Sequence, residues 1–407
     1  MKVIHINTYS HGGGAAIAAR RHCMAMLEAG IDAKMIVYSG KTDERTILFP
    51  YTRIPLLQHI RDSLHYRIST GIVDNSLWDI ESNDFDITAL KEVRDADIIY
   101  IHWVSGYIGT KGILRLLDLG KPIVWYMHDM APITGGCHHS FGCNGYEHEC
   151  TNCPELKYFK SIAASQLMRH MQWKSYENLI GVAPSRWLTE CLKKSSLFGG
   201  HPAYCIPNVV DTRIFRPLNK RDVREKYKLP LNTKLVMFAS MQANDRYKGS
   251  KYLVQTIEKI ASESDYEFLV AGCPNIELFS SSVRNKIHTV GHINDEGQMA
   301  EIYNAADVYL ITSMAENFPN VLIECMACGV PAVGFATGGI IDQIHHKENG
   351  WIVEQKDING LVEGLYWVLE NEQYNELSMS AIEYVRDNCS YSRILEIHRH
   401  VLSFGMH

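Results

Sequence analysis

The sequence has 407 residues, of which 46% are hydrophobic and 21% are charged, and its formal net charge is −6. This composition is ordinary for a globular protein, and the negative charge gives no basic footprint for nucleic-acid binding. Because the chain is longer than one ordinary hydrophobic core, we expect two domains.

Two features predict a cytoplasmic protein. The first predicted strand, residues 2–7, begins beside the initiating methionine, and no apolar run approaches the length of a membrane-spanning helix, so we expect neither a signal peptide nor a membrane span. The eleven cysteines include Cys273, Cys325 and Cys328 at predicted core positions, which is typical of reduced, buried thiols.

A glycine-rich turn follows the first strand. Gly12, Gly13 and Gly14 precede a predicted helix that begins at Ala15. Glycines there let a ligand approach the backbone, and the free N–H groups at a helix start favour anions. A dinucleotide-binding fingerprint is excluded because Ile17 occupies the place of its third glycine and the following strand ends without an acidic residue.

Residues 53–72 place apolar side chains on one helical face with arginines around it. Such a helix either packs its apolar stripe on the core or lies on a membrane surface, and peripheral membrane association at the inner face is therefore one of two alternatives.

Two further buried strands each end in a histidine, followed by Trp103 after His102 and by Asp129 after His128. Because the carboxyl ends of parallel strands meet at one sheet edge, we expect these side chains to share a site there.

A cysteine-rich insertion spans residues 135–154. It contains Cys137, Cys143, Cys150 and Cys153 but few large apolar side chains. We expect the four cysteines to come together as a structural staple. A zinc ion, one or two disulfides and free thiols remain the alternatives, zinc being the favoured clamp.

Residues 307–339 predict a strand, a loop, a helix and a second strand in succession. Glu316 falls in the loop, and Gly329 falls where the helix would stop. The helix also carries Glu324 among apolar neighbours, where a carboxylate needs a partner. A structural Arg or Lys is one candidate partner, and the paired hydroxyls of a ribose are another.

The spacing of Glu316 and Glu324 around Phe318, followed by residues 327–331 and the pair Gly338-Gly339, resembles the donor-site signature of retaining GT-B glycosyltransferases of family 4. The turn-rich stretch 205–217 resembles the interdomain linker of that family. The resemblance implies an α/β fold of two Rossmann-like doubly wound domains facing a cleft. The expected boundaries are 1–207 for an acceptor-side domain, 208–388 for a nucleotide-sugar domain, and 389–407 for a helix crossing back to the first domain.

The resemblance also implies an activity. The protein would transfer a sugar from a nucleoside-diphosphate sugar to a glycan or lipid-linked acceptor, with retention at the anomeric carbon. The expected setting is capsule, O-antigen or exopolysaccharide assembly in the cytoplasm. No metal or other cofactor would be required.

The resemblance assigns roles to individual residues. His128 would lie beside the reacting sugar, and Glu316 would hold a hydroxyl of the donor sugar. Lys248 matches the lysine that stabilises the diphosphate, whereas Ala243 stands where the family has an arginine. Arg246 is the candidate replacement, the alternative being an exposed loop cation. The remaining expected nucleotide-sugar contacts are Gly13, Gly14, Phe318, Asn320, Val321, Glu324 and Ile293. We expect Ile293 within a strand over residues 288–293.

Two other functions are compatible with parts of this pattern. A sugar-nucleotide 2-epimerase shares the GT-B architecture but lacks the two-glutamate context. A sugar-nucleotide-binding protein without catalysis is favoured only by the altered arginine.

Overall fold

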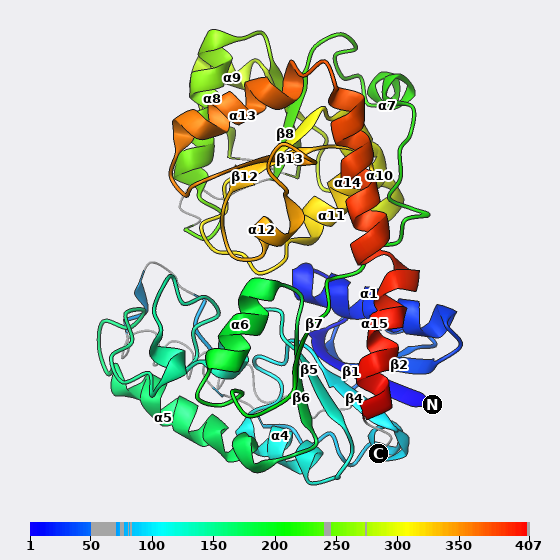
Figure 1. The fold of residues 1–407 in the computed structure, drawn as a ribbon, viewed down its shortest axis with the longest axis vertical. Helices are drawn as coiled ribbons and strands as arrows, with labels where there is room; N and C mark the ends of the chain where they lie inside the picture. The colour runs from blue at the N-terminus through cyan, green and yellow to red at the C-terminus, as the bar shows by residue number, and fades with distance from the viewer. Residues whose placement is uncertain are drawn as a thin grey trace. The chain divides into compact units, whose positions relative to one another are not determined.

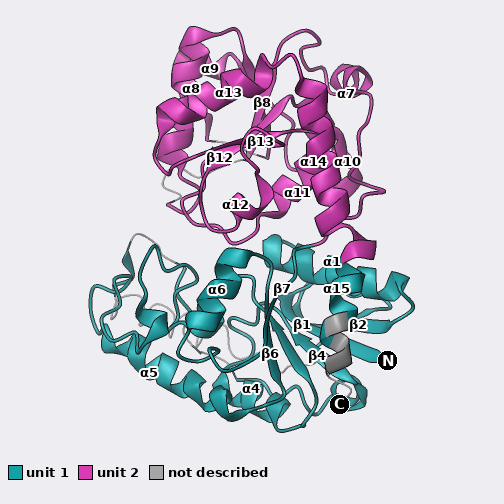
Figure 2. Cartoon of the chain, in the orientation of Figure 1, with its two compact units in different colours: residues 1–208, 394–407 teal, residues 209–393 magenta. Residues whose placement is uncertain are grey.

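The computed structural model describes residues 1–49, 71–73, 77–79, 81, 84–239, 246–272 and 275–404. The chain divides into two compact units, drawn in different colours in Figure 2. Unit 1 comprises residues 1–208 and 394–407, and unit 2 comprises residues 209–393. The division falls one residue from the predicted boundary, and the last residues belong to unit 1. Residues 53–70 of the predicted amphipathic helix lie outside the described residues.

Unit 1 is built on a seven-stranded parallel sheet with the strand order β3-β2-β1-β4-β5-β6-β7 (Figure 1). Its strands are β1 (Lys2–Tyr9), β2 (Asp32–Ser39), β3 (Thr46–Leu48), β4 (Ile98–Ile101), β5 (Ile123–Tyr126), β6 (Leu179–Ala183) and β7 (Ala203–Cys205). Its helices are α1 (Gly14–Glu28), α3 (Lys91–Asp95), α4 (Thr110–Leu117), α5 (Ser161–His170), α6 (Arg186–Lys194) and α15 (Tyr391–Phe404), with short 3₁₀ turns η2 (Ala131–Ile133), η3 (Gly145–Glu147) and η4 (Met171–Ser175).

Unit 2 is built on a six-stranded parallel sheet with the order β10-β9-β8-β11-β12-β13. Its strands are β8 (Leu235–Ala239), β9 (Glu267–Ala271), β10 (Ile287–Thr289), β11 (Val308–Ile311), β12 (Ala332–Phe335) and β13 (Gly350–Val353). Its helices are α7 (Lys220–Lys226), α8 (Ser250–Glu263), α9 (Ser281–Arg284), α10 (Glu296–Ala305), α11 (Asn320–Ala327), α12 (Ile340–Gln343), α13 (Ile358–Leu369) and α14 (Tyr374–Cys389), with the 3₁₀ turn η5 (Ile276–Leu278).

Alternate side chains of the central strands enter different cores. In unit 2, Tyr309 and Ile311 of β11 pack into one apolar cluster, whereas Val308 and Leu310 pack into another. Successive residues of a strand point to opposite faces of the sheet, so helices must cover both faces. These apolar strands therefore form the doubly wound architecture that their sequences predicted.

Each sheet reverses its winding at one point, which lies between β1 and β4 in unit 1 and between β8 and β11 in unit 2. Ligands of open parallel sheets bind outside the carboxyl ends of the strands at such a point. The predicted site residues of each unit lie in the chain that follows these strands or the strands next to them. No helix in the described parts of the chain combines the length and apolarity needed to cross a bilayer.

Candidate functional site

In unit 2, the loop that carries Lys248 is fastened to the end of β11. The Met314 N–H donates to the carbonyl of Tyr247 at 2.7 Å, and the Thr312 hydroxyl donates to the carbonyl of Lys248 at 3.0 Å. Gly249 has a φ of +67°, and a Cβ there would lie 2.1 Å from the carbonyl oxygen of Thr312. Only glycine allows this approach, so the Lys-Gly pair fixes the position of the lysine.

The structure brings Lys248 and Glu316 together as an ion pair. The Lys248 side chain is 46% exposed, whereas that of Glu316 is 13% exposed. The Ser313 hydroxyl donates to the same carboxylate oxygen, Oε1, at 3.2 Å. The other oxygen, Oε2, takes part in neither contact, so a carboxylate already held in place retains an acceptor for a hydroxyl.

Helix α11 begins at Asn320 and ends at Ala327, and Gly329 follows with a φ of +78°, which confirms the predicted helix stop. Phe318, Asn320 and Glu324 are buried, and Val321 is half-buried. The Tyr303 hydroxyl donates to Oε2 of Glu324 at 2.9 Å. The partner that sequence reasoning required thus includes a tyrosine from α10, a neutral group that sequence reasoning did not consider.

Two predicted contacts of unit 2 lie on irregular backbone. Arg246 is half-buried in the turn that contains Lys248, and Ala243 lies outside the described residues. Ile293 was expected within a strand of residues 288–293, but β10 ends at Thr289. The strand prediction was wrong because Gly291 adopts a φ of +73°, which turns the chain out of the extended conformation.

In unit 1, the predicted glycine turn joins β1 to α1. Gly12 and Gly13 both have a φ of +79°, and Gly14 is the first residue of α1. The helix therefore presents N–H groups with no intrahelical acceptor at the carboxyl end of β1, as an anion-binding turn requires.

His128 belongs to a chain of buried imidazoles. Its Nε2 lies 3.0 Å from Nδ1 of His102, whose Nε2 lies 2.9 Å from Nδ1 of His5. A second pair joins Nδ1 of His22 to Nε2 of His398 at 3.2 Å. These contacts confirm that β4 and β5 bring His102 and His128 together. They also tie the His128 ring to β1.

Burial keeps these histidines neutral. It lowers the pKa of His128 to about 4 and, together with the neighbouring His398, that of His5 to about 3. Burial likewise lowers the pKa of His398 to about 3 and places the pKa values of His102 and His22 well below the usual range. A neutral imidazole donates with one nitrogen and accepts with the other, so each ring orients the next.

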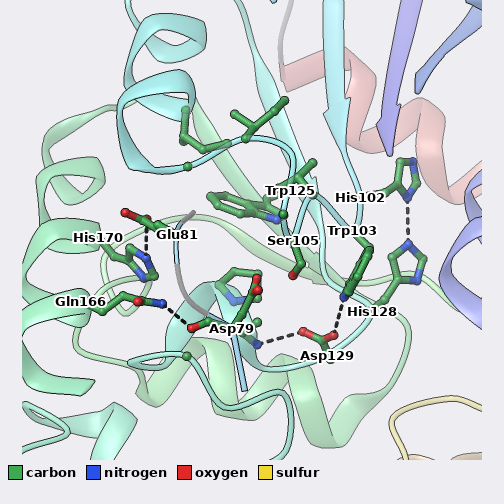
Figure 3. A pocket seen from close by; sticks show the side chains of 18 of the residues that line it. Asp79, Glu81, His102, Trp103, Ser105, Trp125, His128, Asp129, Gln166 and His170 are labelled. Carbon is green, nitrogen blue, oxygen red and sulfur yellow. Dashed lines mark hydrogen bonds and ion pairs between the residues drawn. The ribbon is translucent and has the colours of Figure 1, made fainter. Parts of the chain in front are cut away.

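A pocket opens beside this chain, at the carboxyl ends of β4 and β5 (Figure 3). Its lining combines carboxyl groups, histidines and indole rings with the backbone of the β4–α4 loop. The polar and aromatic lining residues are Asp79, Glu81, His102, Trp103, Ser105, Trp125, His128, Asp129, Gln166, His170 and Trp173.

Asp129 is held firmly in the pocket wall. Its Oδ2 accepts from Trp103 Nε1 at 3.1 Å and lies 2.6 Å from His138 Nδ1, and its Oδ1 accepts from the Ala131 N–H at 2.9 Å. Burial alone would raise the pKa of Asp129, but the neighbouring His138 brings it below the usual range. Burial opposes protonation of His138, but Asp129 nevertheless raises its pKa. Each of the two therefore favours the charged form of the other.

Like Asp129, the Glu81 carboxylate is stabilised by hydrogen bonds from the protein, whereas that of Asp79 is stabilised less. Burial would raise the pKa of Glu81, but hydrogen bonds from His170 and Thr110 bring it to about 2. Burial raises the pKa of Asp79, against the opposing influence of His138 and a hydrogen bond from Ser105. Asp79 is thus the pocket carboxyl whose ionised form is least stabilised by the protein itself.

Sequence reasoning missed most of this pocket. Asp79 and Glu81 lie in irregular chain before α3, and Gln166 and His170 lie on an ordinary amphipathic helix. Trp125 lies within β5, and its apolar neighbours in the sequence predict a core residue. The only available signal was the pair of polar strand ends, which led to His102, Trp103, His128 and Asp129.

The cysteine-rich insertion brings its four cysteines together. Cys137, Cys143, Cys150 and Cys153 line one cavity and are all free thiols. Within the described residues, no group of three or more Cys, His, Asp or Glu side chains is arranged to hold a metal ion. The Gly145 N–H donates to the Cys143 sulfur at 3.4 Å, and the Thr134 hydroxyl donates to the carbonyl of Cys137 at 2.7 Å. The expected gathering of the four cysteines is confirmed, and they are free thiols here, whereas a zinc clamp stays a prediction.

One family model matches much of unit 2. Residues 220–388 match the family model described as "Glycosyl transferases group 1". This match lies within unit 2 and includes Lys248, Glu316 and Glu324. The comparisons as a whole support a group 1 glycosyltransferase.

Two relatives illustrate the range of similarity. N-acetyl-alpha-D-glucosaminyl L-malate synthase of Bacillus anthracis is 27% identical over 41% of this chain and 44% of its own length. The putative colanic acid biosynthesis glycosyl transferase WcaC of Escherichia coli is 23% identical over 89% of this chain and 90% of its own length. The chain thus spans less than half of the first relative and nearly all of the second.

Among solved structures, HepE of Anabaena in complex with UDP-glucose resembles this chain with a TM-score of 0.65 and 15% identity, over 99% of both chains. A likeness at this identity concerns the fold. It confirms two Rossmann-like α/β domains of the GT-B type.

Proposed function

We propose that this protein is a retaining glycosyltransferase of family 4 that transfers a sugar from a nucleoside-diphosphate sugar to a glycan or lipid-linked acceptor. The observation that carries the proposal is the pairing of Lys248 with Glu316 at the switch point of unit 2. A cation for the diphosphate and a carboxylate for the sugar lie side by side there, within a domain that matches the group 1 family. The UDP-glucose bound by HepE supports the class of donor.

Each residue has a definite task in this proposal. Lys248, with Arg246 as a second cation and the N–H groups of Gly13 and Gly14, stabilises the charge that develops on the leaving diphosphate. Oε2 of Glu316 accepts from a sugar hydroxyl. The bond between the anomeric carbon and the diphosphate oxygen breaks. The acceptor oxygen bonds to the same face of the sugar, and its proton passes to an oxygen of the departing diphosphate.

The remaining roles concern recognition. Glu324 holds the ribose hydroxyls, and main-chain groups near Ile293 contact the base, with Phe318, Asn320 and Val321 completing the wall. His128, oriented through His102, lies beside the reacting sugar.

We further propose that no divalent metal is required and that the chain works in the cytoplasm, at the inner face of the membrane where a lipid-linked acceptor is used. The name of WcaC supports a role in polysaccharide assembly.

The test is a panel of nucleotide sugars incubated with the full chain, with nucleotide release followed with and without a bacterial lipid extract, in EDTA and in magnesium. Nucleotide release that requires the extract and is insensitive to EDTA is the expected result. Release of free nucleotide without any acceptor, accompanied by epimerised sugar, would indicate a 2-epimerase. Binding without turnover under every condition would indicate a sugar-nucleotide-binding protein.

A further inference from the structure

Four buried polar atoms, on residues that line the unit 1 pocket, have no hydrogen-bond partner among the described residues. They are Trp125 Nε1, Trp173 Nε1, Gln166 Oε1 and His170 Nδ1. Their side chains are almost fully enclosed, with Trp173 and Gln166 each 2% exposed. Buried polar groups are nearly always paired in folded proteins, and a cluster of unpaired ones around a single pocket therefore indicates a polar ligand.

These atoms differ in kind. The two indole N–H groups can only donate and the Gln166 oxygen can only accept. Nδ1 of His170 accepts, because the neutral ring donates from Nε2 to Glu81. A ligand that satisfies all of them must carry groups that both donate and accept. Hydroxyl groups do so, whereas a phosphate or carboxylate only accepts.

The carboxyl groups of the pocket point to the same chemistry. Asp129 and Glu81 already accept bonds at both of their oxygens. Asp79 accepts one bond, from Ser105, among the described residues, so it retains most of the acceptor capacity of a carboxylate. A ligand hydroxyl or ammonium group would satisfy it, and an anion would not.

The charge of the lining residues also disfavours an anionic ligand. No Lys or Arg is among the described residues that line the pocket, while three of them are carboxylic acids. Arg169 contacts Glu81 but lies outside the lining set. A phosphorylated or acidic group would therefore enter against carboxylates, with no cation at the surface to receive it.

The shape favours a ring edge. The cavity measures about 60 Å³, which is room for about five water-sized groups and far too little for a nucleotide. Indole rings of Trp103, Trp125 and Trp173 form part of its wall. Apolar ring faces combined with a few convergent polar atoms suit the edge of a hydroxylated ring.

We propose that this pocket binds the terminal sugar of the acceptor, and that this sugar is uncharged or carries an amino group rather than a phosphate or carboxylate. Asp79 and Gln166 receive its hydroxyl or ammonium groups, and the Nε1 groups of Trp125 and Trp173 donate to its oxygens. The assignment to the acceptor depends on the proposed function, but the class of sugar follows from the pocket itself.

The experiment measures binding of methyl glycosides to the full-length protein by saturation-transfer NMR and tryptophan fluorescence. The probes are neutral hexosides, a 2-amino-2-deoxyhexoside, a hexuronide and a hexoside 6-phosphate. The variants are Asp79→Asn, which keeps the shape of the side chain, and Trp173→Phe, which removes the N–H donor. Asp118→Asn, an exposed carboxyl of the same unit, is the matched control.

At least one neutral or amino glycoside should bind, with affinity at least ten-fold weaker in Asp79→Asn and unchanged in Asp118→Asn. Where Asp79→Asn does not fold, a ten-fold loss in Trp173→Phe decides the question. Equal or tighter binding of the acidic probes, binding that ignores both variants, or no binding of any glycoside overturns the proposal. Nucleotide-sugar binding is measured on the same samples. Its absence alongside Asp79-dependent glycoside binding rejects the proposed function and leaves this site standing.

Discussion

The candidate sites of the two units differ in how far their polar groups are exposed to solvent. In unit 2, the important charges lie on loops at strand ends, and the ammonium group of Lys248 is half-exposed beside Glu316. In unit 1, Trp125 and Trp173 are buried, and burial lowers the pKa of His128 to about 4, which keeps its imidazole neutral. An exposed charge acts over distance and suits a diphosphate. Desolvated neutral groups act only on contact and suit the shape and hydroxyl pattern of a sugar.

The largest expected effect is that acid lowers the stability of unit 1 before it lowers that of unit 2. Histidines buried in the neutral state bind protons only after unfolding, so unit 1 loses stability as the pH falls from 6.5 towards the pKa of about 4 for His128 and about 3 for His5 and His398. Each contributes about 1.4 kcal/mol per pH unit in that window. In unit 2, burial opposes ionisation of Asp307, but Lys220 and Arg224 keep its pKa below 3.8, so its contribution is lost only in stronger acid.

Hydrogen exchange followed by mass spectrometry at pH 7.5 and pH 5.5, corrected for intrinsic rates, tests this difference. Peptides from β1, β4 and β5 should lose much more protection at the lower pH than peptides from β8, β11 and β12. Equal losses in the two units would show that the buried histidines do not control the stability of unit 1.

The next effect tests the exposed charge of unit 2. Lys248→Ala should lower kcat/KM by about 100-fold, because removal of one group that stabilises transition-state charge commonly costs this much. The melting temperature should change little, since an exposed ion pair contributes about 1 kcal/mol or less. Lys251→Ala, a change at an exposed lysine in the first turn of α8, should leave both quantities unchanged.

Steady-state kinetics on both lysine variants, with Arg246→Ala beside them, provide the measurement. If Lys248→Ala keeps the wild-type kcat/KM while Arg246→Ala is inactive, the family alignment of this loop is wrong and Arg246 is the diphosphate cation.

A smaller effect concerns the buried carboxylate of α11. Glu324→Ala should weaken nucleoside-diphosphate binding by about 1–3 kcal/mol, the cost of unmade hydrogen bonds to a charged group. Tyr303→Phe removes the hydroxyl that donates to Glu324 and should lower stability with a smaller loss of affinity. Calorimetric titrations showing unchanged affinity in a folded Glu324→Ala protein would leave Glu324 with the structural role alone.

Much of the fold could be predicted from the sequence. Buried strands such as β4 and β5 are uninterrupted apolar runs, and Gly329 marks the end of α11 because it adopts a positive φ. The predicted strand over residues 288–293 was too long. The residues around Gly291 do not reveal from sequence whether that glycine adopts a positive φ or an extended conformation.

The two candidate sites differ in how far sequence reasoning reached them. Lys248, Glu316 and Glu324 belong to short patterns that resemble the donor site of a known family, so sequence reasoning could assign them to one site. Asp79, Trp125 and Gln166 come from three separate stretches, and each has an ordinary structural interpretation by itself. Only their convergence, with several polar atoms left unpaired, distinguishes the pocket, and convergence of this kind is a property of tertiary packing.

We propose that unit 2 binds the donor through charged groups and that unit 1 binds the acceptor sugar through close contact. The most direct test measures the affinities of a nucleoside diphosphate and of the best-binding methyl glycoside on Lys248→Ala and on Asp79→Asn. Lys248→Ala should weaken only the nucleotide, with a wild-type affinity that falls as salt is added, and Asp79→Asn should weaken only the glycoside. Loss of both ligands in either folded variant, or loss of neither in both, would contradict this division of labour.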